Sequence, residues 1–291
     1  MTTLSPAARL RKLLAEDTCH VMPCCWDGLS AKMIGDAGFG FTFMSGFAVS
    51  ASRIGAPDTG LISFGEMLDQ GRNICAATDI PVIGDGDTGY GNALNVRRTV
   101  EQYARAGFGA VMIEDQVSPK RCGHTKGKLV VDRDEAFNRI KAAVDAREAG
   151  ADIMILARTD ARHGHGLDEA IDRAKGFSDL GADMLFVEAP QSEAEMARVT
   201  SEAPGIHMAN LVEGGATPIL HPDRLHELGY SFAAYPLTLM SAAMKAIQAS
   251  LAQMARREHP ADRLLDFADL RKAVGFDAYY EAESAYSDNR S

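Results

Sequence analysis

The feature that most constrains the fold of this sequence is a junction that recurs five times: a helix-like segment, a glycine and a short apolar run. The junction glycines are Gly38, Gly107, Gly150, Gly181 and Gly229. A glycine just after a helix supplies the left-handed residue that ends it. The runs that follow are apolar on both faces, as are strands of a parallel sheet covered by helices. The junctions therefore predict alternating helices and parallel strands.

Three further apolar runs, at residues 20–27, 80–85 and 206–210, bring the predicted strands to eight. Helices are predicted between strands, among them residues 95–106, 134–149 and 167–180. Eight strand–helix units in about 250 residues match a closed (β/α)8 TIM-type barrel, an α/β fold. A doubly wound open sheet stays the alternative, because counting strands does not show whether the sheet closes.

The chain is expected to divide into a barrel over residues 1–258 and a C-terminal helical tail over residues 259–291. A long amphipathic helix is predicted at 238–258 and a shorter helix at 264–274. The tail ends in a group of aromatic residues, Phe276, Tyr279, Tyr280 and Tyr286. Aromatic side chains carry large apolar surfaces. We therefore expect the tail to pack on its own barrel or on a partner subunit.

Composition excludes several classes of partner. Forty acidic and thirty basic side chains give a formal net charge of −10, whereas nucleic-acid binding needs positive surface. No apolar run approaches the roughly 18 residues of a membrane span, and the N-terminus lacks the apolar region of a signal peptide. The five cysteines are an odd number without paired metal spacing. These features predict a cytoplasmic globular protein with neither nucleic acid nor membrane as partner.

The segment GDGDTGYGN at residues 84–92 places Asp85 and Asp87 at a strand end with their side chains on one side. Two carboxylates about 4 Å apart repel by roughly 4 kcal/mol at an effective dielectric near 20, which favours a shared cation or proton. Glu114 ends the next strand and is expected at the same mouth. Three carboxylates without a nearby histidine or thiolate indicate Mg2+ or Mn2+ rather than zinc.

The same segment partly matches two other motifs. The spacing of Gly84, Gly86 and Gly89 matches the dinucleotide-binding fingerprint, but the intervening aspartates would repel a pyrophosphate. An EF-hand loop is excluded because its fifth and twelfth positions would be Gly89 and Val96. Solvated loop carboxylates stay the remaining alternative.

A basic segment at residues 116–131 is much longer than the two to six residues of an ordinary turn between strand and helix, and we expect it to be a lid. Its cationic and titratable side chains are Lys120, Arg121, His124, Lys126 and Lys128. In an acidic protein this patch favours a small anionic substrate over nucleic acid. Cys122 lies among these cations, which stabilise a thiolate, and is predicted to be a proton donor or nucleophile.

Several of these motifs together resemble the isocitrate lyase and phosphoenolpyruvate mutase superfamily, over nearly the whole chain. They are SGFAVSAS from Ser45, APDTG with Asp58, GDGDTGYGN, IEDQ, KRCGH from Lys120, ARTDA with Arg158, FVEAP with Glu188 and ANLVEGG with Asn210. KRCGH resembles the carbon–carbon lyase branch rather than the phosphonomutases. GHTKGKLVV, VEAP and NLVEGG resemble the subgroup of petal death protein and 2,3-dimethylmalate lyase.

The resemblance implies an Mg2+-dependent barrel enzyme that cleaves a small 2-hydroxy dicarboxylate between C2 and C3. A 2-alkylmalate or 2,3-dimethylmalate would give an α-keto acid such as pyruvate and a carboxylate. An oxaloacetate hydrolase or decarboxylase and a 2-methylisocitrate lyase are the enzymatic alternatives, and a binding protein without activity is the alternative from another class. The family also implies a homotetramer with an exchanged C-terminal helix, which would cover the aromatic tail.

Carried over by position, the resemblance implies a role for each site residue. Mg2+ would be held by Asp85, Asp87 and Glu114, with Asp58 nearby. The keto-acid end of the substrate would be held by Arg158, Ser45, Gly46 and Phe47. The other carboxylate would be bound by Arg121, Gly123, His124, Glu188 and Asn210. Cys122 would protonate the carbanion as a general acid whose pKa is set by the cations of the lid, so that Lys120, Arg121 and His124 are also predicted to be catalytic residues. Phe43 stands where related lyases carry a tyrosine, so the general base is left open.

Overall fold

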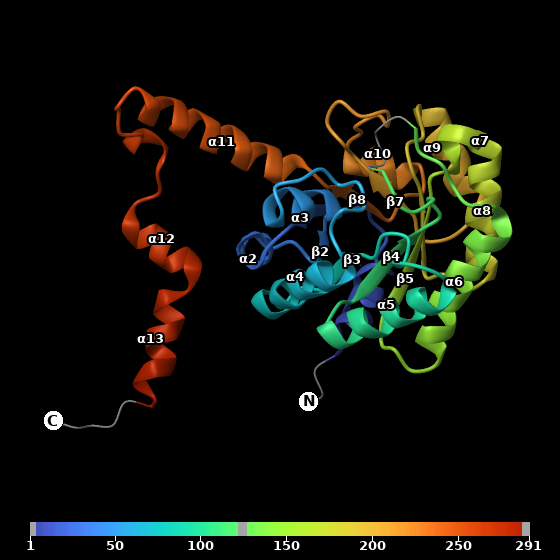
Figure 1. The fold of residues 1–291 in the computed structure, drawn as a ribbon, viewed down its shortest axis with the longest axis horizontal. Coiled ribbons are helices and arrows are strands. Elements are labelled where there is room, and N and C mark those ends of the chain that lie inside the picture. The colour runs from blue at the N-terminus through green and yellow to red at the C-terminus, as the bar shows by residue number, and fades with distance from the viewer. Residues whose placement is uncertain (1–3, 122–126, 287–291) are drawn as a thin grey trace. The chain divides into compact units, whose positions relative to one another are not determined.

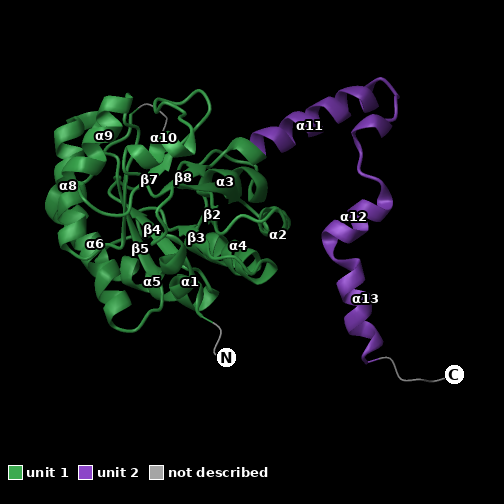
Figure 2. Cartoon of the chain, turned by 180° about the vertical axis from the view of Figure 1, so that it is seen from behind, with its two compact units in different colours: residues 1–239 green, residues 240–291 purple. Residues whose placement is uncertain are grey.

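The computed structural model describes residues 4–121 and 127–286. The chain divides into two compact units, residues 1–239 and 240–291 (Figure 2). Most of the predicted 238–258 helix thus falls in the second unit, and the predicted domain boundary after residue 258 stays a prediction. Within the described part of the chain, no helix combines the length and apolarity needed to cross a bilayer.

Eight parallel strands form the centre of the first unit (Figure 1). They are β1 (His20–Cys25), β2 (Thr42–Met44), β3 (Val82–Asp85), β4 (Ala110–Glu114), β5 (Met154–Thr159), β6 (Met184–Val187), β7 (Met208–Asn210) and β8 (Phe232–Tyr235). Their order is β6-β5-β4-β3-β2-β1-β8-β7. Leu185 of β6 forms a parallel bridge with His207 beside β7, so the sheet closes. The (β/α)8 prediction is confirmed, and the open-sheet alternative is wrong.

Helices alternate with these strands. In the first unit they are α1 (Pro6–Leu13), α2 (Gly28–Asp36), α3 (Gly46–Arg53), α4 (Phe64–Ala77), α5 (Ala93–Ala106), α6 (Arg133–Glu148), α7 (Ala161–His165), α8 (Leu167–Asp179), α9 (Glu193–Glu202) and α10 (Pro222–Glu227). The junction glycines all have φ between 86° and 109°. Because other residues avoid this left-handed region, the recurring glycine is explained by the helix ends it makes possible.

The core has two layers. Inside the barrel, alternate strand residues such as Met22, Ile83 and Phe232 pack together, and Leu10 of α1 joins this cluster. Outside the barrel, strand residues pack against helices, as Val111 does against the cluster that includes Tyr103 of α5. The sequence did not predict α1, whose buried face consists of Ala7 and Leu10.

Several predicted boundaries differ from the structure by a few residues, and two of them are explained by helix caps. The first strand ends at Cys25, not residue 27, because Asp27 caps α2 by accepting a 2.7 Å hydrogen bond from Ser30 N. The helix predicted to begin at residue 264 is α12 (Phe267–Val274); Asp266 caps it by accepting from Asp269 N at 2.7 Å. A side-chain cap of this kind fixes a helix start more sharply than apolar spacing does.

The second unit contains most of α11 (Thr238–Ala255), a short 3-10 turn (Ala261–Arg263), α12 and α13 (Phe276–Ser284). The predicted 238–258 helix ends three residues early. Large apolar side chains of α11 are about half exposed or more, namely Met244, Ile247, Leu251 and Met254. Phe267 and Tyr279 are more than 60% exposed. In the described chain by itself, this unit has apolar surface without a core to bury it.

Candidate active site

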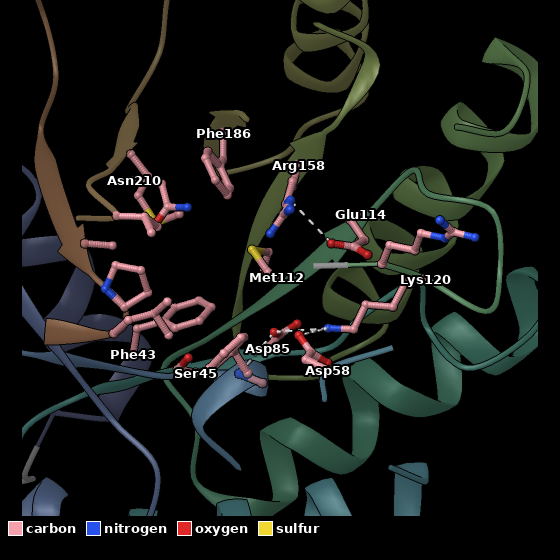
Figure 3. A pocket seen from close by; sticks show the side chains of 18 residues that line it. Phe43, Ser45, Asp58, Asp85, Met112, Glu114, Lys120, Arg158, Phe186 and Asn210 are labelled. Carbon is pink, nitrogen blue, oxygen red and sulfur yellow. Dashed lines mark hydrogen bonds and ion pairs between the residues drawn. The ribbon is translucent and has the colours of Figure 1, made fainter. Parts of the chain in front are cut away.

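A pocket lies at the carboxyl ends of the barrel strands (Figure 3). Ten of the predicted site residues line it: Ser45, Gly46, Phe47, Asp58, Asp85, Glu114, Lys120, Arg121, Arg158 and Asn210. Asp87 and Glu188 are buried and form ion pairs with Lys120 and Arg158, two of the lining residues. The predicted residues Cys122, Gly123 and His124 lie outside the described residues.

The turn from β2 into α3 forms one side of the pocket. Ser45 caps α3, accepting a hydrogen bond from Ala48 N at 3.3 Å. Gly46 N donates to Asp85 Oδ2 at 3.2 Å. A Cβ atom at Gly46 would lie 2.3 Å from that oxygen, closer than nonbonded atoms approach. Glycine is therefore required here for the backbone of α3 to reach the carboxylate at the end of β3.

One half of the pocket, which we call the acid half, consists of Asp58, Asp85, Asp87 and Lys120. Lys120 Nζ lies 2.9 Å from Asp58 Oδ2 and 3.8 Å from Asp85 Oδ2, and forms a shorter ion pair with Asp87 Oδ1. All four side chains are buried. Figure 3 shows the lysine pointing between Asp58 and Asp85. One buried cation therefore faces three buried carboxylates.

This imbalance changes the protonation of Asp87. Burial raises its pKa to about 7, and Asp85 and Asp58 add to the rise although Lys120 opposes it. Burial alone would favour the neutral form of Lys120, but Asp85, Asp87 and Asp58 hold the pKa of Lys120 well above its usual value. Carboxylates close to one another in a low-dielectric site raise each other's pKa in this way. Proton uptake by Asp87 near neutral pH would therefore lessen the negative charge of the acid half.

The other half, which we call the arginine half, consists of Arg158, Glu114, Glu188, Asp160 and Lys128. Arg158 Nε lies 2.7 Å from Asp160 Oδ2 and 3.3 Å from Glu114 Oε2, and its Nη2 lies 3.6 Å from Glu188 Oε2. Its guanidinium also lies over the ring of Phe186 at 5.0 Å. These contacts hold the arginine at the end of β5.

Two carboxyls of the arginine half titrate differently. Burial raises the pKa of Glu114 well above its usual value, although Arg158 opposes the rise. Burial acts on Asp160 in the same direction, but Arg158 and Lys128 outweigh it and lower the pKa of Asp160 to about 2. Across the pocket wall, Asn210 Nδ2 donates to Glu188 Oε2 at 3.3 Å. Asp160 and Lys128 were not predicted as site residues, although the motif ARTDA signals Asp160 two residues after Arg158.

The predicted metal ligands fit a hard cation. Among residues 4–121 and 127–286, no three His, Cys, Asp or Glu side chains converge closely enough to form a coordination set on their own. Within those same ranges, Asp58 Oδ1 and Glu114 Oε1 are buried without a hydrogen-bond partner. Mg2+ prefers carboxylate oxygens and keeps several of its waters. The donor set therefore suits Mg2+ held partly through water, rather than a cage of direct protein ligands.

Apolar side chains line the same pocket, and we call them the apolar wall. It is formed by Phe43, Met112, Phe186, Met208 and Ala234. Figure 3 shows Phe43 and Phe186 on the side of the pocket away from Lys120. Arg121 also lines the pocket but is itself exposed. The pocket thus combines groups suited to bind carboxylates with a surface suited to bind an alkyl group.

Comparison with known proteins places this geometry in a family. A family model described as phosphoenolpyruvate phosphomutase matches residues 10–255. The chain is 40% identical to 2,3-dimethylmalate lyase of Eubacterium barkeri, over 99% of this chain and 100% of that protein. It is 38% identical to petal death protein of Dianthus caryophyllus, over 95% of this chain and 88% of that protein. It is 35% identical to 2-methylisocitrate lyase of Bacillus subtilis, over 96% of this chain and 91% of that protein.

Solved structures agree. A crystal structure of 2,3-dimethylmalate lyase superimposes with a TM-score of 0.93 at 34% identity, covering 99% of this chain and 98% of that chain. Oxaloacetate acetylhydrolase superimposes with a TM-score of 0.92 at 33% identity, covering 99% of this chain and 99% of that chain. Phosphonopyruvate hydrolase with bound oxalate and Mg2+ superimposes with a TM-score of 0.85 at 29% identity, covering 97% of this chain and 99% of that chain. The predicted family resemblance is confirmed. The chain therefore belongs to the phosphoenolpyruvate mutase and isocitrate lyase superfamily, to which the lyases named above belong, and it is an enzyme of that superfamily.

Proposed function

We propose that this enzyme is an Mg2+-dependent lyase that cleaves a 2-alkylmalate or 2,3-dimethylmalate between C2 and C3. The products would be pyruvate, or a related α-keto acid, and a saturated carboxylate. The observation that carries this choice is the apolar wall that lines the pocket together with the charged residues. Burying alkyl groups against such a wall contributes about 0.8 kcal/mol per CH2, a contribution that oxaloacetate, which has no alkyl substituent, would not receive.

The residues of the pocket have distinct roles in this reaction. Arg158 would bind the carboxylate next to C2, with the start of α3 at Gly46 beside it. Asp85, Asp87 and Glu114 would hold Mg2+ with its waters. When bound, the cation would supply positive charge near the 2-oxygen and the adjoining carboxylate. Glu188 and Asn210 are hydrogen-bonded to each other and would orient the second carboxylate.

The reaction breaks one carbon–carbon bond and moves two protons, one from the substrate to a base and one from an acid to the substrate. The 2-hydroxyl gives up its proton to a base, C2 becomes a carbonyl carbon, and the electron pair of the C2–C3 bond stays on C3. That carbanion is stabilised because its charge spreads into the neighbouring carboxylate. Cys122 would donate the proton that C3 takes up. Phe43 lines the pocket but has no titratable group, so the base must be another residue or a bound water.

Hydrolysis of oxaloacetate is the second candidate, favoured by the close superposition on oxaloacetate acetylhydrolase. The two functions are separated by incubating the protein and Mg2+ with 2-alkylmalates, 2,3-dimethylmalate, 2-methylisocitrate and oxaloacetate in separate reactions. A keto-acid assay and proton NMR identify the products. We expect keto acid from a dialkylmalate and none when EDTA removes the metal. No turnover of any malate-type substrate would contradict the proposal.

We also propose that the chain acts in the cytoplasm as a homotetramer in which α11 packs on a partner subunit. Met244, Ile247, Leu251 and Met254 of α11 are spaced by three, four and three residues and are exposed. Such spacing forms an apolar stripe suited to another helix. Ile247→Asp should lower the mass measured by light scattering, and Gln248→Asp, a matched change at an exposed polar position of the same helix, should not. A monomeric wild type would contradict this assembly.

A further inference from the structure

We propose that Asp160 is a positioning residue that holds Arg158 toward the substrate and, through Lys128, ties it to the base of the 116–131 segment. This inference rests on the proposed function, because it assigns Arg158 to a substrate carboxylate. Asp160 itself would touch neither substrate nor metal. Three sets of contacts among the described residues fix the position of Asp160.

The first set is a fork between Asp160 and Arg158. Arg158 Nε donates to Asp160 Oδ2 at 2.7 Å, and Nη2 donates to Oδ1 at 3.1 Å. Two parallel hydrogen bonds of this kind fix the plane of a guanidinium as well as its position. They engage one edge of the group, and Nη1 is the remaining nitrogen to meet a substrate carboxylate. The Phe186 ring at 5.0 Å supports one face of the same plane.

The second set links Asp160 to the base of the basic segment. Lys128 Nζ donates to Asp160 Oδ1 at 2.7 Å, and both side chains are almost fully buried. The flanking backbone is paired, because Val117 N donates to Leu129 O at 2.8 Å and Gln116 forms an antiparallel bridge with Val130. One carboxylate oxygen is therefore shared by Arg158 and by a lysine on this paired stem, so that moving one partner disturbs the other.

The third set of contacts holds the backbone of Asp160. Its backbone N–H donates to Asp115 Oδ1 at 2.9 Å, and Arg173 Nη1 donates to Asp115 Oδ2 at 3.0 Å. The same Arg173 nitrogen donates to Val131 O at 2.9 Å. Asp115 and Arg173 thus connect the end of β5 with the end of the stem through buried, charge-assisted hydrogen bonds. With its backbone held at this junction, Asp160 has little freedom to follow Arg158 if the arginine moves.

The test compares Asp160→Asn with a matched control. Asn keeps the shape of the side chain but removes the charge and one acceptor of the fork. Glu195→Gln makes the same change in another arginine fork, in which Arg162 donates two hydrogen bonds to Glu195, of 2.9 and 2.7 Å. Neither of these two residues lines the pocket. For each protein we would measure kcat and KM with 2,3-dimethylmalate and Mg2+, and oxalate binding by calorimetry in Mg2+.

We expect Asp160→Asn to raise KM and the oxalate Kd at least tenfold while kcat changes less than threefold, and Glu195→Gln to match the wild type. A split of this kind would not follow from general loss of stability, which lowers the amount of active enzyme and leaves KM unchanged. If the wild type binds oxalate and Asp160→Asn binds it with the same Kd, the positioning role of Asp160 is overturned and the proposed function is not. A wild type that neither binds oxalate nor cleaves a malate would overturn the proposed function first.

A second variant tests the tie to the stem and does not depend on Asp160→Asn folding. Lys128→Met leaves the fork intact and should raise the oxalate Kd by three- to tenfold. In the double variant the lysine change should add almost nothing, because residues that act through one group show non-additive effects. An unchanged Kd in Lys128→Met, or full additivity in the double variant, would overturn the tie.

Discussion

Two buried aspartates, one in each half of the pocket, differ in the direction of their pKa shifts. Burial and the neighbouring carboxylates raise the pKa of Asp87 to about 7. For Asp160, Arg158 and Lys128 outweigh burial and lower the pKa to about 2. The difference lies in the cations that contact each aspartate: Asp87 pairs with Lys120, which also pairs with Asp58 and Asp85, whereas Asp160 pairs with both Arg158 and Lys128. The acid half has three carboxylates and one cation, which fits the proposed metal site, and the arginine half has three carboxylates and two cations.

The largest expected effect comes from removing a carboxylate of the acid half. Asp87→Ala should lower turnover to the level seen without added Mg2+, because the proposed metal site loses a ligand. The measurement is turnover as a function of Mg2+ concentration in both proteins. Unchanged Mg2+ dependence in the variant would contradict the assignment of Asp87 to the metal and would remove the functional basis of the comparison.

Replacing the lysine of each half sharpens the comparison. Lys120→Gln leaves three buried carboxylates without their cation, and breaking a buried pair typically costs about 3–5 kcal/mol. We expect that loss in metal-free unfolding, with Mg2+ recovering much of it. Lys128→Gln should cost less, since Arg158 still pairs with Asp160, and Mg2+ should not reduce the cost. Equal responses to Mg2+ in urea unfolding of the two variants would show that the halves do not differ.

Cys122 lies in sequence between Lys120 of the acid half and Lys128 of the arginine half. Cys122→Ser should lower kcat by roughly 10²-fold, within the usual range for losing a general acid, and should leave the oxalate Kd within a few-fold of the wild type. The other four cysteines are buried or half-buried, and Cys75→Ser serves as a control outside the pocket. Equal kcat in Cys122→Ser and wild type would exclude this thiol from the chemistry.

The smallest expected effect is the pH dependence of stability that Asp160 causes. Because its pKa is lower in the folded protein than in the unfolded chain, its stabilisation is present above about pH 4 and is lost as the pH falls toward 2. A shift from 3.8 to about 2 corresponds to on the order of 2 kcal/mol. The difference in unfolding free energy between wild type and Asp160→Asn should therefore shrink over that pH range. A constant difference would contradict the ion pairing of Asp160.

Much of the fold was predictable because its signals are local. A junction glycine must follow each helix that ends in the left-handed region, and the apolar runs between these glycines locate the strands to within a few residues. The positions of Asp85, Glu114 and Arg158 at strand ends were predictable for the same reason, since parallel strands of a barrel end at one mouth.

The contacts among the charged side chains were not predictable. Lys120 was expected in a lid above the substrate, yet its ammonium lies among Asp58, Asp85 and Asp87. The fork of Asp160 and the burial of Lys128 depend on how residues 115–131 pack against the end of β5, which no spacing in the sequence encodes. Helix α1 escaped prediction because only two of its residues are buried.

The preference of the pocket for an alkylated substrate is tested most directly by a competition in one tube. The enzyme, Mg2+, 2,3-dimethylmalate and oxaloacetate at equal concentrations would be followed by proton NMR. We expect propionate to appear before acetate, with one pyruvate for each propionate beyond the pyruvate that oxaloacetate releases by decarboxylation in a tube without enzyme, and we expect no propionate to form after EDTA is added. Accumulation of acetate with 2,3-dimethylmalate left intact would contradict the claim that the apolar wall selects an alkylated substrate.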